Sequence, residues 1–184
     1  MRARRRDLLL LTGVLGALGA LAAGVQTSGL RWQHTESLPR GLYWLDRDAQ
    51  IGRGSIALWC LDEARGRWAR ERGYLTRGKC PGEVEALGKV VLALAGDTID
   101  WSPSGIRLNG LPVARTTPML RDRTGRALEP FAYRRYVLAT STAWLFSPYS
   151  VRSLDSRYFG PQPISRSLGV VRPFWTANRG QPSR

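Results

Sequence analysis

The sequence predicts a mostly β domain over residues 26–176, behind one N-terminal transmembrane helix. Residues 8–25 are 18 residues without a charge, and as a helix they would span roughly 27 Å, enough for a bilayer core. Many short apolar segments follow, with turn-forming residues between them, a pattern typical of short strands. Asn109-Gly110 between two apolar segments is a strong hairpin signal.

The N-terminal segment also predicts orientation. Residues 1–7 form a basic segment with four arginines, and the next arginine is Arg31. Positive charge on one side of the apolar segment places the N-terminus in the cytoplasm and the rest of the chain outside. A cleaved signal peptide is the alternative, with 20–22 (Ala-Leu-Ala) as the cleavage site. Eighteen apolar residues exceed the usual signal-peptide core, so we expect an uncleaved anchor.

The rest of the chain alternates between apolar segments and turns. Residues 89–95 form an unbroken apolar segment after a lysine, which predicts a strand buried on both faces. The charged stretch 61–72 predicts a helix. We expect a connector at 26–33, loops at 73–82, 121–130 and 147–160, and a mobile tail at 177–184. The expected strands are 42–45, 55–60, 89–95, 98–101, 106–108, 111–113, 136–139, 143–146 and 168–174.

The chain is strongly basic. It holds 28 Lys and Arg against 14 Asp and Glu, for a net charge of +14. This balance favours acidic partners such as anionic lipid, nucleic acid or a negatively charged assembly. The sequence has no zinc-finger spacing, basic heptad helix or ribonucleoprotein aromatic motif, so we expect no nucleic-acid partner. A solvated, arginine-rich surface is the alternative explanation.

The two cysteines agree with export. Cys60 and Cys80 are the only cysteines, and in an oxidising compartment we expect them to form a disulfide. Two free structural thiols are the alternative. His34 is the only histidine and lies far away in sequence, so we expect no metal site at the cysteines. We also expect no cofactor.

Lys89 is an unusual residue for this composition. Only two of the 28 basic residues are lysines, and Lys89 lies inside an apolar segment. Lysine, unlike arginine, loses its proton near neutral pH when it is desolvated. The sequence therefore predicts that Lys89 is a buried general base.

Ser37 is the candidate nucleophile. It lies in a turn framed by Pro39 and Gly41, and a serine hydroxyl attacks only when a base takes its proton. Neutral Lys89 would serve as that base in a Ser-Lys arrangement. His34 is a rival base three residues before Ser37, with Glu36 as its only evident acidic neighbour. An ordinary turn-forming serine is the alternative.

Three segments together resemble the type I signal peptidase family. Residues 35–43 (Thr-Glu-Ser-Leu-Pro-Arg-Gly-Leu-Tyr) resemble its nucleophile segment, and residues 89–97 (Lys-Val-Val-Leu-Ala-Leu-Ala-Gly-Asp) its lysine strand and following turn. Residues 153–161 (Ser-Leu-Asp-Ser-Arg-Tyr-Phe-Gly-Pro) are similar to its third segment. The Ser-x-Pro-x-Gly-Leu-Tyr form and the single anchor are closest to the TraF-type peptidases of conjugative transfer. The stretch 147–150 (Ser-Pro-Tyr-Ser) replaces the family's Gly-Asp-Asn element.

The resemblance implies a signal-peptidase-like β fold and a role for each matching residue. Ser37 would attack the scissile carbonyl, and Lys89 would accept the hydroxyl proton and later protonate the leaving amine. The Ser37 N–H and the Thr35 hydroxyl would hold the oxyanion, although Thr35 is also consistent with an ordinary strand threonine. Ser153 matches the hydroxyl that orients the lysine amine.

Several other residues are consistent with more than one role. Asp155 matches a residue required in TraF-type enzymes, where it is either catalytic or paired with Arg157. We favour the pair, because a carboxylate touching Lys89 would raise the lysine pKa and oppose base function. We expect Asp97 to cap the turn after the lysine strand. The sequence is equally consistent with two placements of four aromatic residues, an apolar face near the bilayer or ordinary core packing. These residues are Trp32, Trp44, Trp101 and Phe159.

The resemblance implies a serine endopeptidase of the bacterial inner membrane with its catalytic domain in the periplasm. Its substrate would be a membrane-bound, exported pilin-like precursor. Its partners would be inner-membrane lipid and components of a conjugative secretion system. TraF-type enzymes are also associated with joining pilin ends into a cyclic product. The alternatives are a housekeeping signal peptidase that processes many precursors and a non-catalytic basic assembly factor of the envelope.

Overall fold

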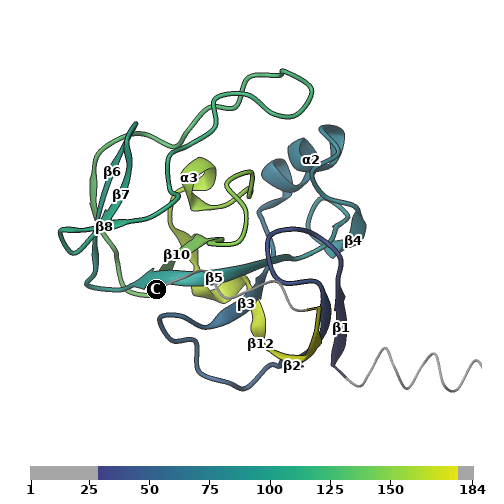
Figure 1. Cartoon of the computed structure of the whole chain (residues 1–184). Helices are drawn as coiled ribbons and strands as arrows, with labels where there is room; N and C mark the ends of the chain where they lie inside the picture. Colours follow the sequence, from purple (N-terminus) through teal and green to yellow (C-terminus); the bar gives the residue numbers. More distant parts are fainter. Residues whose placement is uncertain (1–28, 178–184) are drawn as a thin grey trace, which may run out of the picture.

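The computed structural model describes residues 29–177, which form two antiparallel sheets and short helices (Figure 1). The larger sheet has seven strands in the order β1-β2-β12-β3-β5-β10-β11, and the smaller has four in the order β8-β7-β6-β9. The strands are β1 (Leu30–Gln33), β2 (Gly41–Asp46), β3 (Ile56–Trp59), β4 (Arg77–Cys80), β5 (Leu87–Leu94), β6 (Thr98–Ser102), β7 (Gly105–Leu108), β8 (Leu111–Val113), β9 (Arg135–Val137), β10 (Thr142–Phe146), β11 (Gln162–Pro163) and β12 (Ser167–Thr176). The helices are α2 (Glu63–Glu71), α3 (Ser156–Phe159) and the short 3-10 helix η1 (Ile164–Arg166).

The prediction of a mostly β body is confirmed. The predicted anchor at 8–25 lies outside the described residues, as does nearly all of the predicted tail. Within residues 29–177, no helix is long and apolar enough to cross a membrane.

β5 lies between β3 and β10 in the larger sheet and carries Lys89 as its third residue. Lys89 is opposite Ala57 on β3. The strand was predicted to be buried on both faces, but only the face of Leu87, Lys89, Val91 and Ala93 is fully buried. On the other face, three of the four residues are half-buried.

The hairpin in the smaller sheet forms at the predicted residues. Asn109 and Gly110 join β7 to β8 with positive φ angles of 50° and 84°. Positive φ at both central residues matches the right-handed twist of the flanking strands. This hairpin lies beside β6, which follows β5 in the chain.

Three elements lie where the sequence predicted a connector or loops. β1 pairs with β2 across four residues, so its strand conformation depends on a partner rather than on its own apolar content. β4 is polar, and Gly78 packs so closely on Glu85 that a Cβ would lie 2.5 Å from its backbone. α3 begins in the predicted loop 147–160, where Asp155 caps it by accepting a hydrogen bond from the Arg157 N–H.

Cys60 and Cys80 are joined by a disulfide with a Cα–Cα distance of 5.4 Å. It ties the end of β4 to the residue after β3 and lies in an apolar cluster with α2 residues. Of the four aromatic residues noted above, Trp101 and Phe159 are core residues, whereas Trp32 and Trp44 are exposed.

Candidate active site

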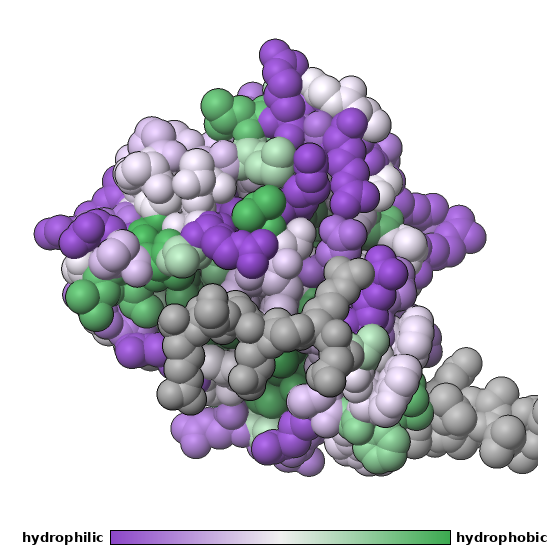
Figure 2. Space-filling model, in the orientation of Figure 1, coloured by the Kyte–Doolittle hydropathy of each residue, from purple (hydrophilic) through white to green (hydrophobic). Residues whose placement is uncertain are grey.

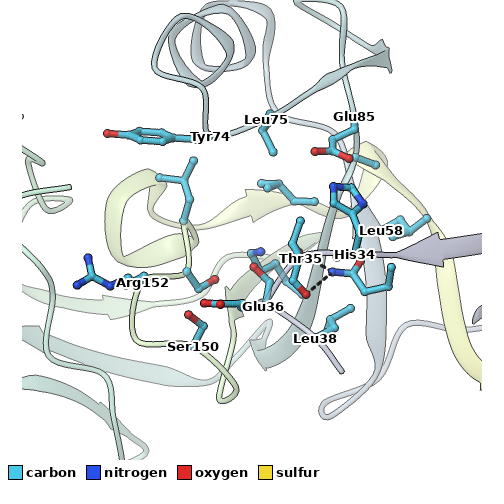
Figure 3. A pocket seen from close by; sticks show the side chains of 18 of the residues that line it. His34, Thr35, Glu36, Leu38, Leu58, Tyr74, Leu75, Glu85, Ser150 and Arg152 are labelled. Carbon is cyan, nitrogen blue, oxygen red and sulfur yellow. Dashed lines mark hydrogen bonds between the residues drawn. The ribbon is translucent and has the colours of Figure 1, made fainter. Parts of the chain in front are cut away.

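Ser37, Lys89 and Ser153 line one cavity of about 1090 Å³. The turn between β1 and β2, the start of β5, the stretch 72–80, the loop 119–128 and residues 150–154 surround it. Figure 3 shows Thr35 and Glu36 from the first of these segments and Ser150 from the last among the residues that line it. Segments far apart in the sequence therefore form a groove large enough to hold a peptide segment.

Three hydrogen bonds hold the turn that carries Ser37, and two of them come from residues far away in sequence. The Ser37 carbonyl accepts a hydrogen bond from Ser147 Oγ at 2.6 Å. The Pro39 carbonyl accepts one from the Tyr43 hydroxyl at 2.8 Å, and the Arg40 carbonyl one from the Ala177 N–H at 2.9 Å. Because three carbonyls in four residues are fixed in this way, the serine is held in position before a substrate binds.

The Ser37 turn also packs against the strand that carries Lys89. Leu38 is 2% exposed, and it lies so close to Gly88 that a Cβ there would be 2.7 Å from Leu38 Cδ1. A side chain at position 88 would force the end of the Leu38 side chain to move. The glycine before the lysine therefore lets Leu38 pack directly on β5.

Lys89 is buried, and burial changes its titration. The side chain is 2% exposed. Desolvation lowers the lysine pKa to about 8, although Asp155 and Glu85 oppose this shift by their negative charge and Arg157 reinforces it. A substantial share of Lys89 is therefore neutral at slightly alkaline pH, as a general base requires.

Asp155 forms a buried ion pair with Arg157. Both side chains are 0% exposed, and Arg157 donates to the two carboxylate oxygens at 2.8 and 3.0 Å. The same guanidinium donates to the Ser153 carbonyl at 3.0 Å and lies over the Phe146 ring. Asp155 is thus paired with Arg157, and its effect on Lys89 is through charge.

Gln33 organises Thr35. The Gln33 amide nitrogen donates to the Thr35 hydroxyl at 2.5 Å and to the Thr35 carbonyl at 3.2 Å, and Figure 3 marks a hydrogen bond at Thr35. A carbonyl only accepts, so the amide must present its NH₂ group here. The hydroxyl oxygen therefore accepts from Gln33, and its own proton remains available to another acceptor.

Ser153 Oγ is buried and has no hydrogen-bond partner within residues 29–177. Such a group normally finds a partner. Its position on the cavity that also contains Lys89 leaves it available to the lysine amine.

The remaining predicted residues separate into two groups. His34 and Glu36 line the cavity and are exposed, and Glu36 pairs with Arg123 at 3.2 Å. Asp97 is not among the lining residues. It follows the other end of β5, where it accepts hydrogen bonds from the Leu94 N–H and Asn109.

Sequence reasoning missed two residues of the site, Gln33 and Ser147. Gln33 was assigned to a connector. Ser147 was noted only as part of a segment that departs from the family pattern. Its bond to Ser37 spans 110 residues, and no local pattern could reveal it.

The sequence profile described as "Signal peptidase, peptidase S26" matches residues 8–175. The chain belongs to this family. It is 35% identical over 163 residues to the plasmid transfer protein TraF of Escherichia coli, covering 88% of this chain and 91% of that protein. It is 36% identical over 181 residues to a probable conjugal transfer protein TraF of Sinorhizobium fredii, covering 94% and 93%.

Among solved structures, a signal peptidase I from Enterococcus faecalis V583 aligns with a TM-score of 0.38 and 15% identity, over 66% of this chain and 97% of that one. The family match spans all three segments that resemble signal peptidases in the sequence, so the chain is a TraF-like member of the S26 peptidases.

Proposed function

We propose that this protein is a membrane-anchored serine endopeptidase that cuts an exported, pilin-like precursor for conjugative transfer. The observation that carries the proposal is the cavity that holds a serine on a fixed turn together with a buried lysine of lowered pKa. The names of the TraF relatives, which refer to plasmid and conjugal transfer, support the biological setting.

In the proposed reaction, Ser37 Oγ attacks the scissile carbonyl while neutral Lys89 takes the hydroxyl proton. Lys89 then gives that proton to the leaving amine, which departs and leaves an acyl-enzyme. Water attacks the ester, Lys89 accepts its proton, and that proton returns to Ser37. Each proton that Lys89 accepts is passed on, so the lysine ends neutral.

The oxyanion would be held by the Ser37 N–H and the Thr35 hydroxyl. Gln33 supports this role, since its donation to Thr35 Oγ leaves the hydroxyl proton free to point at the substrate. One such donor typically contributes about 2.7–4 kcal/mol to lowering the barrier. Ser153 would accept or donate at the Lys89 amine and hold it toward Ser37.

An exposed apolar face supports a position at the membrane. Leu30 is opposite Trp44 and Trp32 opposite Leu42 in the β1–β2 pair, and Leu42 is opposite Trp175 on β12. Directly opposed residues share a face of a sheet, and Trp32, Trp44 and Trp175 are 60%, 47% and 58% exposed. Tryptophan is enriched at membrane interfaces, and this face begins five residues after the predicted anchor.

The test is cleavage of a pilin-like precursor by the full chain in detergent micelles. Wild type should release the mature product, and Ser37→Ala and Lys89→Arg should not, since arginine stays protonated. Ser150→Ala is the matched control, because Ser150 lines the same cavity without an assigned role. Cleavage by Ser37→Ala at the wild-type rate would contradict the proposal, and broad cleavage of unrelated secreted precursors would favour a housekeeping peptidase.

A further inference from the structure

The cavity is far richer in unpaired positive charge than the remaining described surface. Ten Lys and Arg line it, against three Asp and Glu. Within residues 29–177, only two of these ten form an ion pair with a carboxylate, whereas eight of the twelve basic residues elsewhere do. A generally arginine-rich composition would not leave the unpaired charges gathered at one groove.

Four of the unpaired cations come from the stretch 72–80 and the loops 119–128 and 150–154, which together line one part of the cavity wall. They are Arg72, Lys79, Arg121 and Arg152. Within residues 29–177, Arg72 and Arg121 donate to the carbonyl oxygens of Ala127 and Gly125 and to no carboxylate. We call these four side chains the basic rim. Hydrophilic side chains gather at the top of Figure 2, where Figure 1 shows the loop after β8 approaching α2.

The acidic residues of the cavity are already engaged. Asp122 accepts hydrogen bonds from Tyr74 and Arg126, and Glu36 pairs with Arg123. Glu85 accepts the Thr76 N–H at 3.1 Å. None of the three therefore pairs with a member of the basic rim.

The basic rim adjoins the proposed reacting groups from two sides. Arg152 directly precedes Ser153, and the ion pair of Arg123 with Glu36 brings the loop 119–128 beside the residue that precedes Ser37. Ser37 and the basic rim line the same cavity, so a peptide held with its scissile bond at Ser37 shares that cavity with the rim. Resting on the proposed function, we propose that the precursor carries Asp or Glu side chains there, and that the basic rim selects for them.

Binding of matched peptides to the Ser37→Ala full chain in zwitterionic micelles tests this inference without cleavage. One fluorescent peptide has an alanine centre flanked by glutamates, and the other has glutamines at the same positions. At low salt the glutamate peptide should bind about tenfold more tightly if two or more charge pairs form, since each partly exposed pair contributes up to about fivefold. The difference should vanish at 1 M salt, where the Debye length is about 3 Å.

The charge-removing variant is Arg121→Gln/Arg152→Gln on the same Ser37→Ala background. It should lose most of the preference for glutamate. The matched control Arg107→Gln/Arg115→Gln removes two exposed arginines outside the cavity and should keep it.

Equal binding of the two peptides would overturn the inference, as would a preference that survives in the Arg121/Arg152 variant. A parallel measurement follows binding of the same proteins to vesicles of anionic lipid. If the Arg121/Arg152 variant lost binding only to these vesicles, the inference would be overturned, because the basic rim would then contact headgroups. Cleavage is measured separately with Ser37 intact. Charge-dependent binding without cleavage would contradict the proposed function and leave only the selection of acidic peptides by the basic rim.

Discussion

Replacing Lys89 with methionine should abolish activity and make the folded protein more stable at neutral pH. Methionine has nearly the shape of lysine without the charge, and removing a buried charge in favour of an apolar side chain is commonly stabilising. The lysine pKa falls from 10.5 to about 8 in the folded protein. At 1.36 kcal/mol per pKa unit, the stabilisation at pH 7 is about 3 kcal/mol.

The pH dependence follows from the same shift. Below pH 8 Lys89 is charged in both the folded and the unfolded protein, so the cost of burying the charge is fully present. Between pH 8 and 10.5 the folded protein holds a neutral lysine while the unfolded chain still binds the proton, so wild-type stability rises with pH. The advantage of Lys89→Met should therefore shrink to about 1.4 kcal/mol by pH 9.5.

The assay is urea unfolding of the full chain in micelles, followed by tryptophan fluorescence at pH 7, 8, 9 and 9.5. Lys79→Met is the control, because Lys79 is the only other lysine and is exposed. Taking the difference between variants cancels the titration of all other groups. A Lys89→Met protein that is no more stable than wild type at pH 7, or an advantage independent of pH, would refute the reasoning.

Four further predictions concern the proposed chemistry. With the Lys89 pKa about 8, kcat/KM for a precursor peptide should rise about tenfold from pH 7 to pH 9; a flat profile would exclude Lys89 as the base. In Gln33→Glu the new carboxylate should accept a hydrogen bond from the Thr35 hydroxyl, so kcat should fall by about 10²-fold, as it should in Thr35→Val. The double variant should lose little more activity than either single variant; additive losses would mean that Gln33 acts independently of Thr35. Ser147→Ala should free the Ser37 carbonyl and lower kcat on the order of tenfold at unchanged KM, with Ser147→Thr restoring most of it; a change in KM alone would assign Ser147 to substrate binding. Asp155→Asn should leave Arg157 buried without its partner and lower the free energy of unfolding by about 3–5 kcal/mol in urea titrations; lost activity at unchanged stability would instead make Asp155 catalytic.

The strands that could be predicted from the sequence are those whose own residues report burial. β5, β10 and the β7–β8 hairpin have apolar segments or a defining turn pair, and they form where expected. β1 and β4 could not be found this way, because their conformation depends on β2 and on close backbone packing at Gly78. α3 is four residues long, too short for a periodic pattern.

The residues of the site also differ in whether local sequence could predict them. Lys89 was predicted from one contrast of residue type with its surroundings, and Ser37 from a turn. The structure brings both to one cavity. Ser147 and Gln33 act through single hydrogen bonds that only the folded chain creates. The basic rim is likewise defined by which basic residues pair with a carboxylate, and only the folded structure shows those pairs.

The most direct test of the Ser37–Lys89 account is titration of the Lys89 amine by NMR in the full chain. Selective ¹⁵N-lysine labelling gives two side-chain signals, because the chain has only two lysines, and Lys79→Arg leaves the Lys89 signal alone. We predict a midpoint near pH 8, moving lower in Asp155→Asn, which removes a negative charge that raises the Lys89 pKa. A Lys89 amine that stays protonated up to pH 10 would contradict its role as the base for Ser37.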